Sequence, residues 1–196
     1  MDLKTLFRIQ SNTLHPKPGN VLLSEPTMDD FYFGRSVILL IDHNETEGSF
    51  GIIMNKSLNV SLGEVANLFK DADAPIYLGG PVSEDHIFFM HTLGDLIPDT
   101  YKIMEGLYWG GDTDTLNALL STGIANKDNV RFFLGYSGWD AGQLANELER
   151  NTWIVCPTDS RSIFSTPPET MWKHYVDRMG VRYKIWSQYP RNPENN

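Results

Sequence analysis

The chain has 196 residues, of which 41% are hydrophobic and 12% aromatic, so it is long enough to bury one sizeable core. Its formal net charge of -9, with Lys and Arg scattered singly apart from a weak cluster at Arg178, Arg182 and Lys184, argues against direct binding of nucleic acid. A lone cysteine, Cys156, excludes an internal disulfide framework, and with no signal peptide or apolar membrane-spanning run we expect a cytoplasmic protein.

The sequence divides into three parts. Residues 1–18 are an N-terminal arm, because a short apolar cluster is broken there by Pro16 and Pro18. Residues 19–180 are expected to form one domain, and 181–196 a C-terminal extension that is disordered from about residue 190. Docking of the arm on the core is the simpler interpretation, and a partner-binding arm is the alternative.

Apolar patterning predicts the elements in chain order. Strands are expected at 21–23, 36–41, 50–54, 76–78, 86–92, 101–104, 107–109, 130–134 and 152–156. Helices are expected at 61–70, 113–122 and 140–148, and from about 166 to 180. The run 36–41 is almost continuously apolar, which indicates a strand covered on both faces. Several hairpins combined with about four helices predict an α+β fold.

One stretch links a predicted strand to a predicted helix. We interpret residues 135–138 as a tight glycine turn, after which Asp140 and Gln143 have the spacing of a capping box. Tight packing between strand and helix is one interpretation. Contact of a ligand with the backbone at Tyr136, Ser137, Gly138 and Trp139 is a second, although Asp140 would place its own negative charge at such an anion site. Ser137 as a nucleophile is a third, but the Gly-x-Ser-x-Gly pattern is absent.

Two further places carry candidate ligand-binding residues. Gly79, Gly80 and Pro81 follow a strand, where they would form either a structural turn or part of a recess shared with the first glycine stretch. Arg35 and Asn55 lie at the ends of predicted strands, where polar side chains either tie loops together or bind ligands. Neither place has the pattern of a phosphate-binding loop or a dinucleotide fingerprint.

Metal-binding and aromatic residues are interpreted conservatively. The loop 42–47 contains oxygen and imidazole ligands, but their spacing matches no metal site. His86 and His91 are five residues apart on one strand, so they point to opposite faces. We therefore expect neither a metal nor a cofactor. The tryptophans that flank apolar runs are assigned to the core, with a ligand platform as the alternative, and these are Trp109, Trp139, Trp153 and Trp172.

Several motifs together resemble a known bacterial family. In order they are Phe33-Gly34-Arg35-Ser36-Val37, Gly51-Ile52-Ile53-Met54-Asn55-Lys56, Tyr77-Leu78-Gly79-Gly80-Pro81-Val82, Leu134-Gly135-Tyr136-Ser137-Gly138-Trp139, Gly142-Gln143-Leu144, Phe164, Thr166-Pro167-Pro168 and Trp172. This set is similar to the YqgE/AlgH family over about residues 19 to 180. The chain departs from the family in its longer arm, in its ending after Trp186, and at Asp140, where relatives carry a small residue.

The resemblance implies a single α+β domain with a mixed, mostly antiparallel sheet that is coiled or bifurcated and packed by helices. Some members carry the label of transcriptional regulator. The leading hypothesis is a non-enzymatic binding or regulatory domain, monomeric or weakly dimeric, that acts through a protein partner or a small ligand. The alternatives are an enzyme or binder for a small anionic or nucleotide-like ligand at the glycine stretches with Arg35, Asn55 and Ser137, and a regulator that contacts DNA directly.

Overall fold

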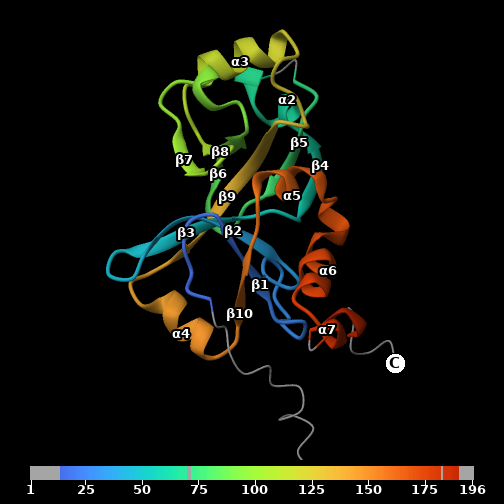
Figure 1. The fold of residues 1–196 in the computed structure, drawn as a ribbon. Helices are drawn as coiled ribbons and strands as arrows, with labels where there is room; N and C mark the ends of the chain where they lie inside the picture. The colour runs from blue at the N-terminus through green and yellow to red at the C-terminus, as the bar shows by residue number, and fades with distance from the viewer. Residues whose placement is uncertain (1–13, 70–71, 182, 190–196) are drawn as a thin grey trace, which may run out of the picture.

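The fold is organised around β9 (Val130–Trp139), a long strand that joins two lobes in the computed structural model (Figure 1). The structure describes residues 14–69, 72–181 and 183–189. Most of the predicted arm and the segment predicted to be disordered from about residue 190 lie outside the described residues. The other strands are β1 (Asn20–Ser24), β2 (Val37–Asn44), β3 (Gly48–Ile53), β4 (Ser57–Ser61), β5 (Pro75–Leu78), β6 (Val82–His91), β7 (Tyr101–Met104), β8 (Leu107–Trp109) and β10 (Trp153–Pro157).

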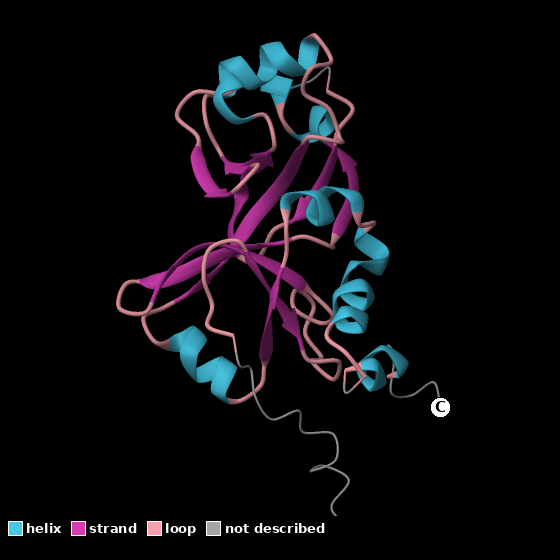
Figure 2. Cartoon of the chain, in the orientation of Figure 1, coloured by secondary structure: helices cyan, strands magenta, loops and turns pink. Residues whose placement is uncertain are grey.

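The helices are short and lie on the outside of the sheet (Figure 2). They are α2 (Leu62–Val65), α3 (Thr113–Ser121), α4 (Gln143–Glu149), α5 (Ser160–Ser165), α6 (Pro168–Arg178) and α7 (Lys184–Gln188), with 3-10 turns η1 (Asn67–Phe69) and η2 (Gly94–Leu96). The described residues thus contain six α-helices where the sequence predicted about four. The extra ones, α5 and α7, span one or two turns each, which is too short for a repeated apolar period to be recognised.

The sheet forks along β9. Its strand order is β10-β1-β2-β3-β9-β6-β8-β7, and β5, which also carries β4, pairs with the first half of β9. Only the β5–β9 pair is parallel among the strands described. Residues 130–136 of β9 pair with β6, and 137–139 pair with β3. The mostly antiparallel, bifurcated α+β architecture is therefore confirmed.

Three glycines allow the strands to approach each other at the fork. A Cβ on Gly79 would lie 2.1 Å from the Gly135 carbonyl oxygen, and one on Gly80 would lie 2.3 Å from the carbonyl of Tyr136. Gly135 itself has φ +70, which strongly favours glycine. The Gly79 amide donates to Leu134 O at 2.8 Å, while its carbonyl accepts from Ile53 N at 2.9 Å. Side chains at these positions would force the two lobes apart.

Three hydrophobic clusters stabilise the fold: the largest runs from the lower lobe (β1, β2, β3, β10, α4, α6 and α7) into the upper lobe (β4–β8, α2 and α3), and each lobe also has a smaller cluster of its own. In the lower lobe, alternate residues of β1, β2 and β10 face opposite sides of the sheet, with α6 and α7 over one side and α4 over the other (Figure 1). Both faces are covered, so Val37 to Ile41 are all fully buried, as predicted from the continuous apolar run. The upper lobe has its own cluster, which includes Leu62 of α2 and Leu116 of α3.

The predicted turn at 135–138 is wrong. These residues remain in β9, and the following helix α4 begins at Gln143 with Gly142 as its N-cap at φ +73. Asp140 therefore does not cap the helix. Half of the predicted capping box is present, because Gln143 Oε1 accepts from the Asp140 amide at 3.0 Å. The strand continues because β3 offers a new hydrogen-bonding partner for its last three residues.

Other local predictions are confirmed. Glu64 accepts from the Ser61 amide at 2.7 Å, although the helix that follows is only four residues long. The Asp112 side chain caps α3 by accepting from Thr115 N at 2.8 Å. Helix α6 begins at Pro168 and buries Met171, Trp172, Tyr175 and Val176. Proline suits this first position because its missing N–H has no intrahelical partner there in any case.

Candidate functional site

The predicted site residues separate into a buried contact and two surface hollows. Gly79, Gly80 and Ser137 belong to the buried contact at the fork of the sheet. Ser137 is 1% exposed, and its hydroxyl donates to Gly79 O at 3.2 Å. Pro81 follows at the surface. The two glycine segments therefore meet backbone to backbone, and the Ser137 hydroxyl is directed into the protein.

The first hollow, which we call the aromatic recess, contains the other residues of the β9 stretch. It has a volume of about 640 Å³. Its lining residues come from the β2–β3 hairpin, β6, β8, β9 and the start of α4, and they are Asp42, Asn44, Glu47, Gly48, Ser49, Phe50, Val82, Phe88, Trp109, Tyr136, Gly138, Trp139, Asp140 and Gln143. The volume falls in the range of about 300–1,000 Å³ that is typical of ligand-binding pockets.

Four half-buried rings form the floor of the aromatic recess. Phe88 is stacked on Trp109 with centroids 5.7 Å apart, and it meets Tyr136 edge to face at 5.8 Å. Phe50 contacts both Trp109 and Tyr136, at 6.1 Å and 5.9 Å. All four side chains retain partial exposure. These contacts fix the ring orientations before any ligand arrives, because edge-to-face and offset-stacked pairs are mutually stabilising.

Glu147 of α4 holds one wall of the aromatic recess in place. Its Oε2 accepts from Trp139 Nε1 at 2.8 Å and from Trp153 Nε1 at 2.6 Å. Its Oε1 accepts from Gln143 Nε2 at 2.8 Å. Trp139 is 6% exposed, so its indole N–H would lack a partner without this carboxylate. The sequence showed Trp139 but gave no sign of Glu147, because an acidic residue in a short helix is ordinarily expected to be exposed to solvent.

The rim of the aromatic recess is acidic. Asp42, Glu47 and Asp140 are exposed, and among the described residues that line the recess there is no Lys, Arg or His. Close to the rim, His43 of β2 and Ser49 of β3 are cross-strand neighbours, and His43 Nδ1 lies 2.7 Å from Ser49 Oγ. Within the described part of the chain, no carboxylate is hydrogen-bonded to the other ring nitrogen of His43 to orient it as a catalytic base.

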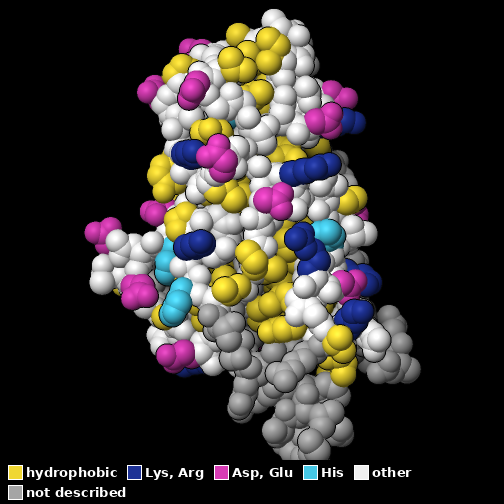
Figure 3. All heavy atoms as spheres, viewed as in Figure 1, with side chains coloured by type: hydrophobic (Ala, Val, Ile, Leu, Met, Phe, Trp, Pro, Cys, Tyr) yellow, Lys and Arg dark blue, Asp and Glu magenta, His cyan; other side chains and the backbone are white. Residues whose placement is uncertain are grey.

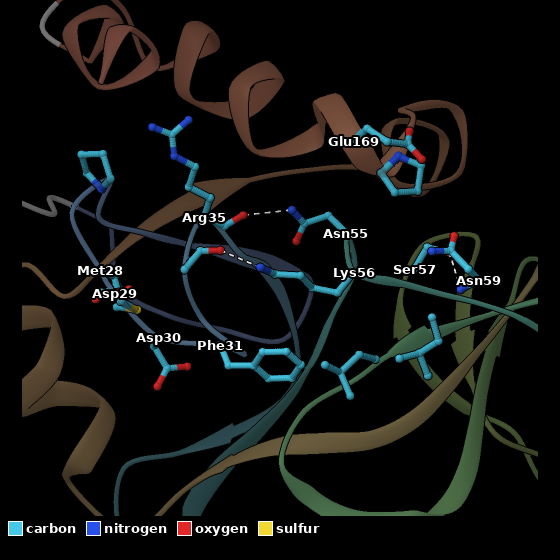
Figure 4. A pocket seen from close by; sticks show the side chains of 15 residues that line it. Met28, Asp29, Asp30, Phe31, Arg35, Asn55, Lys56, Ser57, Asn59 and Glu169 are labelled. Atoms are coloured by element: carbon cyan, nitrogen blue, oxygen red, sulfur yellow. Dashed lines mark hydrogen bonds between the residues drawn. The ribbon is translucent and has the colours of Figure 1, made fainter. Parts of the chain in front are cut away.

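The second hollow, which we call the polar cavity, contains Arg35 and Asn55 and has a volume of about 630 Å³ (Figure 4). Asn55 Nδ2 donates to Arg35 O at 3.0 Å, and its Oδ1 accepts from Val37 N at 2.8 Å. Lys56 Nζ donates to Gly34 O at 2.8 Å. These bonds hold the loop before β2, in which Arg35 has the unusual φ of +50.

Charges of both signs share the polar cavity. The Arg35 guanidinium lies over the Trp172 ring at 5.1 Å from its centroid and donates to the Tyr189 carbonyl. Carboxylates line the cavity as well, from Asp29, Asp30 and Glu169. The cavity therefore brings together Arg35 and Asn55, but its described lining residues include none of 79–81 or 135–139.

The histidines of β6 differ in environment, as their spacing predicted. His86 is exposed, whereas His91 is fully buried. Burial lowers the pKa of His91, partly offset by the hydrogen bond to Gly110 O at 3.1 Å. Its Nδ1 accepts from Leu93 N at 3.2 Å, so the neutral ring carries its proton on Nε2.

Neither a metal cluster nor a spanning helix occurs in the parts of the chain that the structure describes. Over residues 14–69, 72–181 and 183–189, no three His, Cys, Asp or Glu side chains are grouped so that they could hold a metal ion. Over the same residues, every helix is too short or too polar to cross a membrane. On the face seen in Figure 3, acidic and basic side chains are interspersed.

Comparison with known proteins gives one consistent family. The AlgH-like family model matches residues 21–184. A UPF0301 protein from Bacteroides fragilis is 42% identical over the full length of both chains, and one from Parabacteroides distasonis is 43% identical over 98% of each. The solution structure of the AlgH protein from Pseudomonas aeruginosa has a TM-score of 0.68 and 30% identity over 90% of this chain and 98% of that one. The crystal structure of a Corynebacterium diphtheriae protein has a TM-score of 0.72 and 25% identity, covering 90% and 94%.

Proposed function

The chain belongs to the AlgH-like family, and from this starting point we propose that it is a non-enzymatic binding or regulatory domain whose aromatic recess recognises a protein partner. The observation that carries the proposal is the floor of four partly exposed rings at Phe50, Phe88, Trp109 and Tyr136. Large aromatic side chains that desolvate on contact contribute much of the affinity of protein interfaces.

The recess is also rigid, which favours binding. Its rings lie on β3, β6, β8 and β9, which are hydrogen-bonded to one another, and each ring contacts at least two others. A partner would therefore lose little binding free energy to ordering of these side chains. The proposal differs from the sequence hypothesis in its site, which combines Tyr136, Gly138 and Trp139 with three rings from other strands.

Affinity capture from cells that natively express the protein tests this proposal. The tagged chain is compared with the double variant Phe88→Leu/Tyr136→Leu, which keeps apolar bulk, and with Phe31→Leu, which removes an aromatic side chain that is 79% exposed and lies in the polar cavity. We expect mass spectrometry to identify a protein retained by the wild type and by Phe31→Leu but lost by the double variant. Retention of the same protein by all three would contradict the proposal.

An enzymatic role is tested separately at the His43–Ser49 pair. Hydrolytic activity on panels of esters and phosphate esters that disappears in Ser49→Ala would overturn the non-enzymatic proposal. We expect the wild type and Ser49→Ala to be indistinguishable on such panels. Both proteins should also retain the captured partner, because Ser49 is at the margin of the recess and is not one of its four rings.

The polar cavity supports a second candidate function, which is binding of a small anionic or nucleotide-like ligand. Arg35, Asn55 and Lys56 line it together, and cationic and amide groups are the usual partners of phosphate. The carboxylates of Asp29, Asp30 and Glu169 oppose such a ligand, which is why we rank this candidate second. Calorimetric titration with ATP and with inorganic phosphate at two temperatures tests it, because binding that is lost in Lys56→Gln supports the candidate and an absence of heat at both temperatures refutes it.

A further inference from the structure

We propose that the aromatic recess accepts the cationic side chain of an Arg or Lys within a basic segment of the protein partner. This inference rests on the proposed function and adds the chemistry of the occupant. The faces of Trp, Tyr and Phe are electron-rich, so a cation within about 6 Å of a ring centroid is attracted to them. Four such rings from four strands converge here, with neighbouring centroids 5.7–6.1 Å apart.

The charges around the rings favour the same occupant. Asp42 and Glu47 from the β2–β3 hairpin and Asp140 after the end of β9 add exposed carboxylates to the lining of the recess, and no lining residue in the described part of the chain is Lys, Arg or His. Asp42 accepts from the His43 amide at 2.8 Å, and Glu47 accepts from Asn44 Nδ2 at 3.4 Å, which leaves oxygen atoms of both groups available to a ligand. A guanidinium that lies on the rings can thus pair with rim carboxylates through its N–H groups.

The recess is also open to a peptide backbone. Gly138 lies between Tyr136 and Trp139 on β9 and is exposed, and even a Cβ at this position would come no closer than 3.5 Å to a neighbouring atom. The absence of a side chain leaves room for a partner chain beside the strand. The overall charge of -9 adds long-range attraction, because an acidic protein steers basic partners toward it.

Two other occupants would use the same hollow. A purely apolar segment would bind the rings without needing the rim. A small free cation would need the rings and the rim without a peptide backbone. The acidic rim argues against a purely apolar segment, since such a segment offers no ion pair or hydrogen bond to the exposed carboxylates. The volume of about 640 Å³ argues against a small free cation, because it is far larger than one guanidinium group.

Titration of the full-length chain with defined peptides tests the inference. The probe is a capped hexapeptide of alternating Gly and Arg, and its control replaces Arg by citrulline, which has nearly the same shape but no charge. The readout is the indole N–H signal of Trp109 in a nitrogen–proton correlation spectrum, assigned with Trp109→Phe. We expect the Arg peptide to bind at least tenfold more tightly than the citrulline peptide.

Charge and ring variants locate the site. The rim variant Asp42→Asn/Glu47→Gln/Asp140→Asn should bind the Arg peptide about tenfold more weakly, since each exposed ion pair contributes a modest part. A matched variant, Asp73→Asn/Asp128→Asn/Glu149→Gln, changes the net charge equally at exposed positions outside the recess and should weaken binding less than about twofold. Phe88→Leu keeps apolar bulk but removes one ring face, and should weaken binding about three- to thirtyfold.

Four results would overturn the inference. The first two are equal affinity for the Arg and citrulline peptides, and a Trp109 signal that neither peptide changes. The third is equal loss of affinity in the rim variant and the matched variant. The fourth is binding of free arginine amide as tight as that of the Arg peptide, which would assign the recess to a small cation. The capture experiment judges the proposed function independently. A partner lost by Phe88→Leu/Tyr136→Leu in the absence of any preference for Arg would refute the cationic occupant and leave the recess as the binding site.

Discussion

Replacement of Gly79 by alanine is the sharpest stability test of the forked sheet. The added methyl carbon would lie 2.1 Å from Gly135 O and 2.7 Å from the Ile52 side chain, whereas ordinary contacts are 3.4 Å or more. The first of these neighbours is backbone within a paired strand, so it cannot move aside by changing a rotamer. We therefore expect β5 and β9 to separate locally.

The magnitude follows from what this separation removes. The Gly79 amide donates to Leu134 O, and the Gly79 carbonyl accepts from Ile53 N and from Ser137 Oγ. Each such bond contributes about 1 kcal/mol, and overpacking of a close contact costs roughly 1–3 kcal/mol. Gly79→Ala should therefore lower the free energy of unfolding by about 4–6 kcal/mol, which corresponds to a decrease in Tm of roughly 8–24 °C for a chain of this size.

A matched glycine in the same region provides the control. A Cβ on Gly138 would meet its nearest neighbours at 3.5 Å and 3.9 Å, which are ordinary contacts, and its φ is not positive. Gly138→Ala should therefore be close to neutral or slightly stabilising. Urea denaturation followed by far-ultraviolet circular dichroism measures both variants. Equal midpoints for Gly79→Ala and Gly138→Ala would refute the reasoning.

Three further predictions concern buried polar groups. Burial lowers the pKa of His91, so as the pH falls below about 6.5 this histidine is protonated in the unfolded chain before it is protonated in the folded chain. The free energy of unfolding should therefore decrease below this pH in the wild type but not in His91→Gln, as measured by urea midpoints from pH 5 to 8. Arg131 is buried, and its Nη1 lacks a hydrogen-bond partner among the described residues. Arg131→Met should therefore leave the free energy of unfolding unchanged or raise it by up to about 3 kcal/mol. A decrease of more than about 2 kcal/mol would contradict this expectation. Glu147→Leu should cost about 2–5 kcal/mol because it removes the carboxylate that accepts from the indole N–H groups of Trp139 and Trp153, whereas Glu147→Gln, which keeps an acceptor, should cost clearly less in the same denaturation assay.

The strands were predictable wherever burial was continuous. Residues 36–41 are apolar because both faces of that part of the sheet are covered, and the structure places β2 there as expected.

The predicted turn at the glycine stretch is wrong for a physical reason. Glycine at 135 and 138 is a local signal for a turn, but Gly135 serves a contact with Gly79, which is distant in sequence. Only the folded chain shows that the positive φ occurs within a strand.

The candidate site was only partly visible in the sequence. Tyr136, Gly138 and Trp139 were identified from one motif, whereas Phe50 and Phe88 lie in strands whose aromatic residues are ordinarily assigned to the core. Trp109 is assigned to the core, and the structure bears this out in part, because Trp109 packs against the main core cluster but remains partly exposed in the recess. Which rings stay exposed depends on how β6 and β9 diverge from β3 at the fork, and no local sequence pattern determines this geometry.

Photocrosslinking in cells that natively express the protein tests the central claim most directly. Benzoylphenylalanine at Val82, which lines the aromatic recess and is 36% exposed, is compared with the same residue at Leu68, which is 50% exposed on the upper lobe. We predict a discrete protein adduct from position 82 that disappears when Tyr136→Leu is added, and no such adduct from position 68. The absence of an adduct at 82, or the same adduct from both positions, would contradict a partner site in the recess.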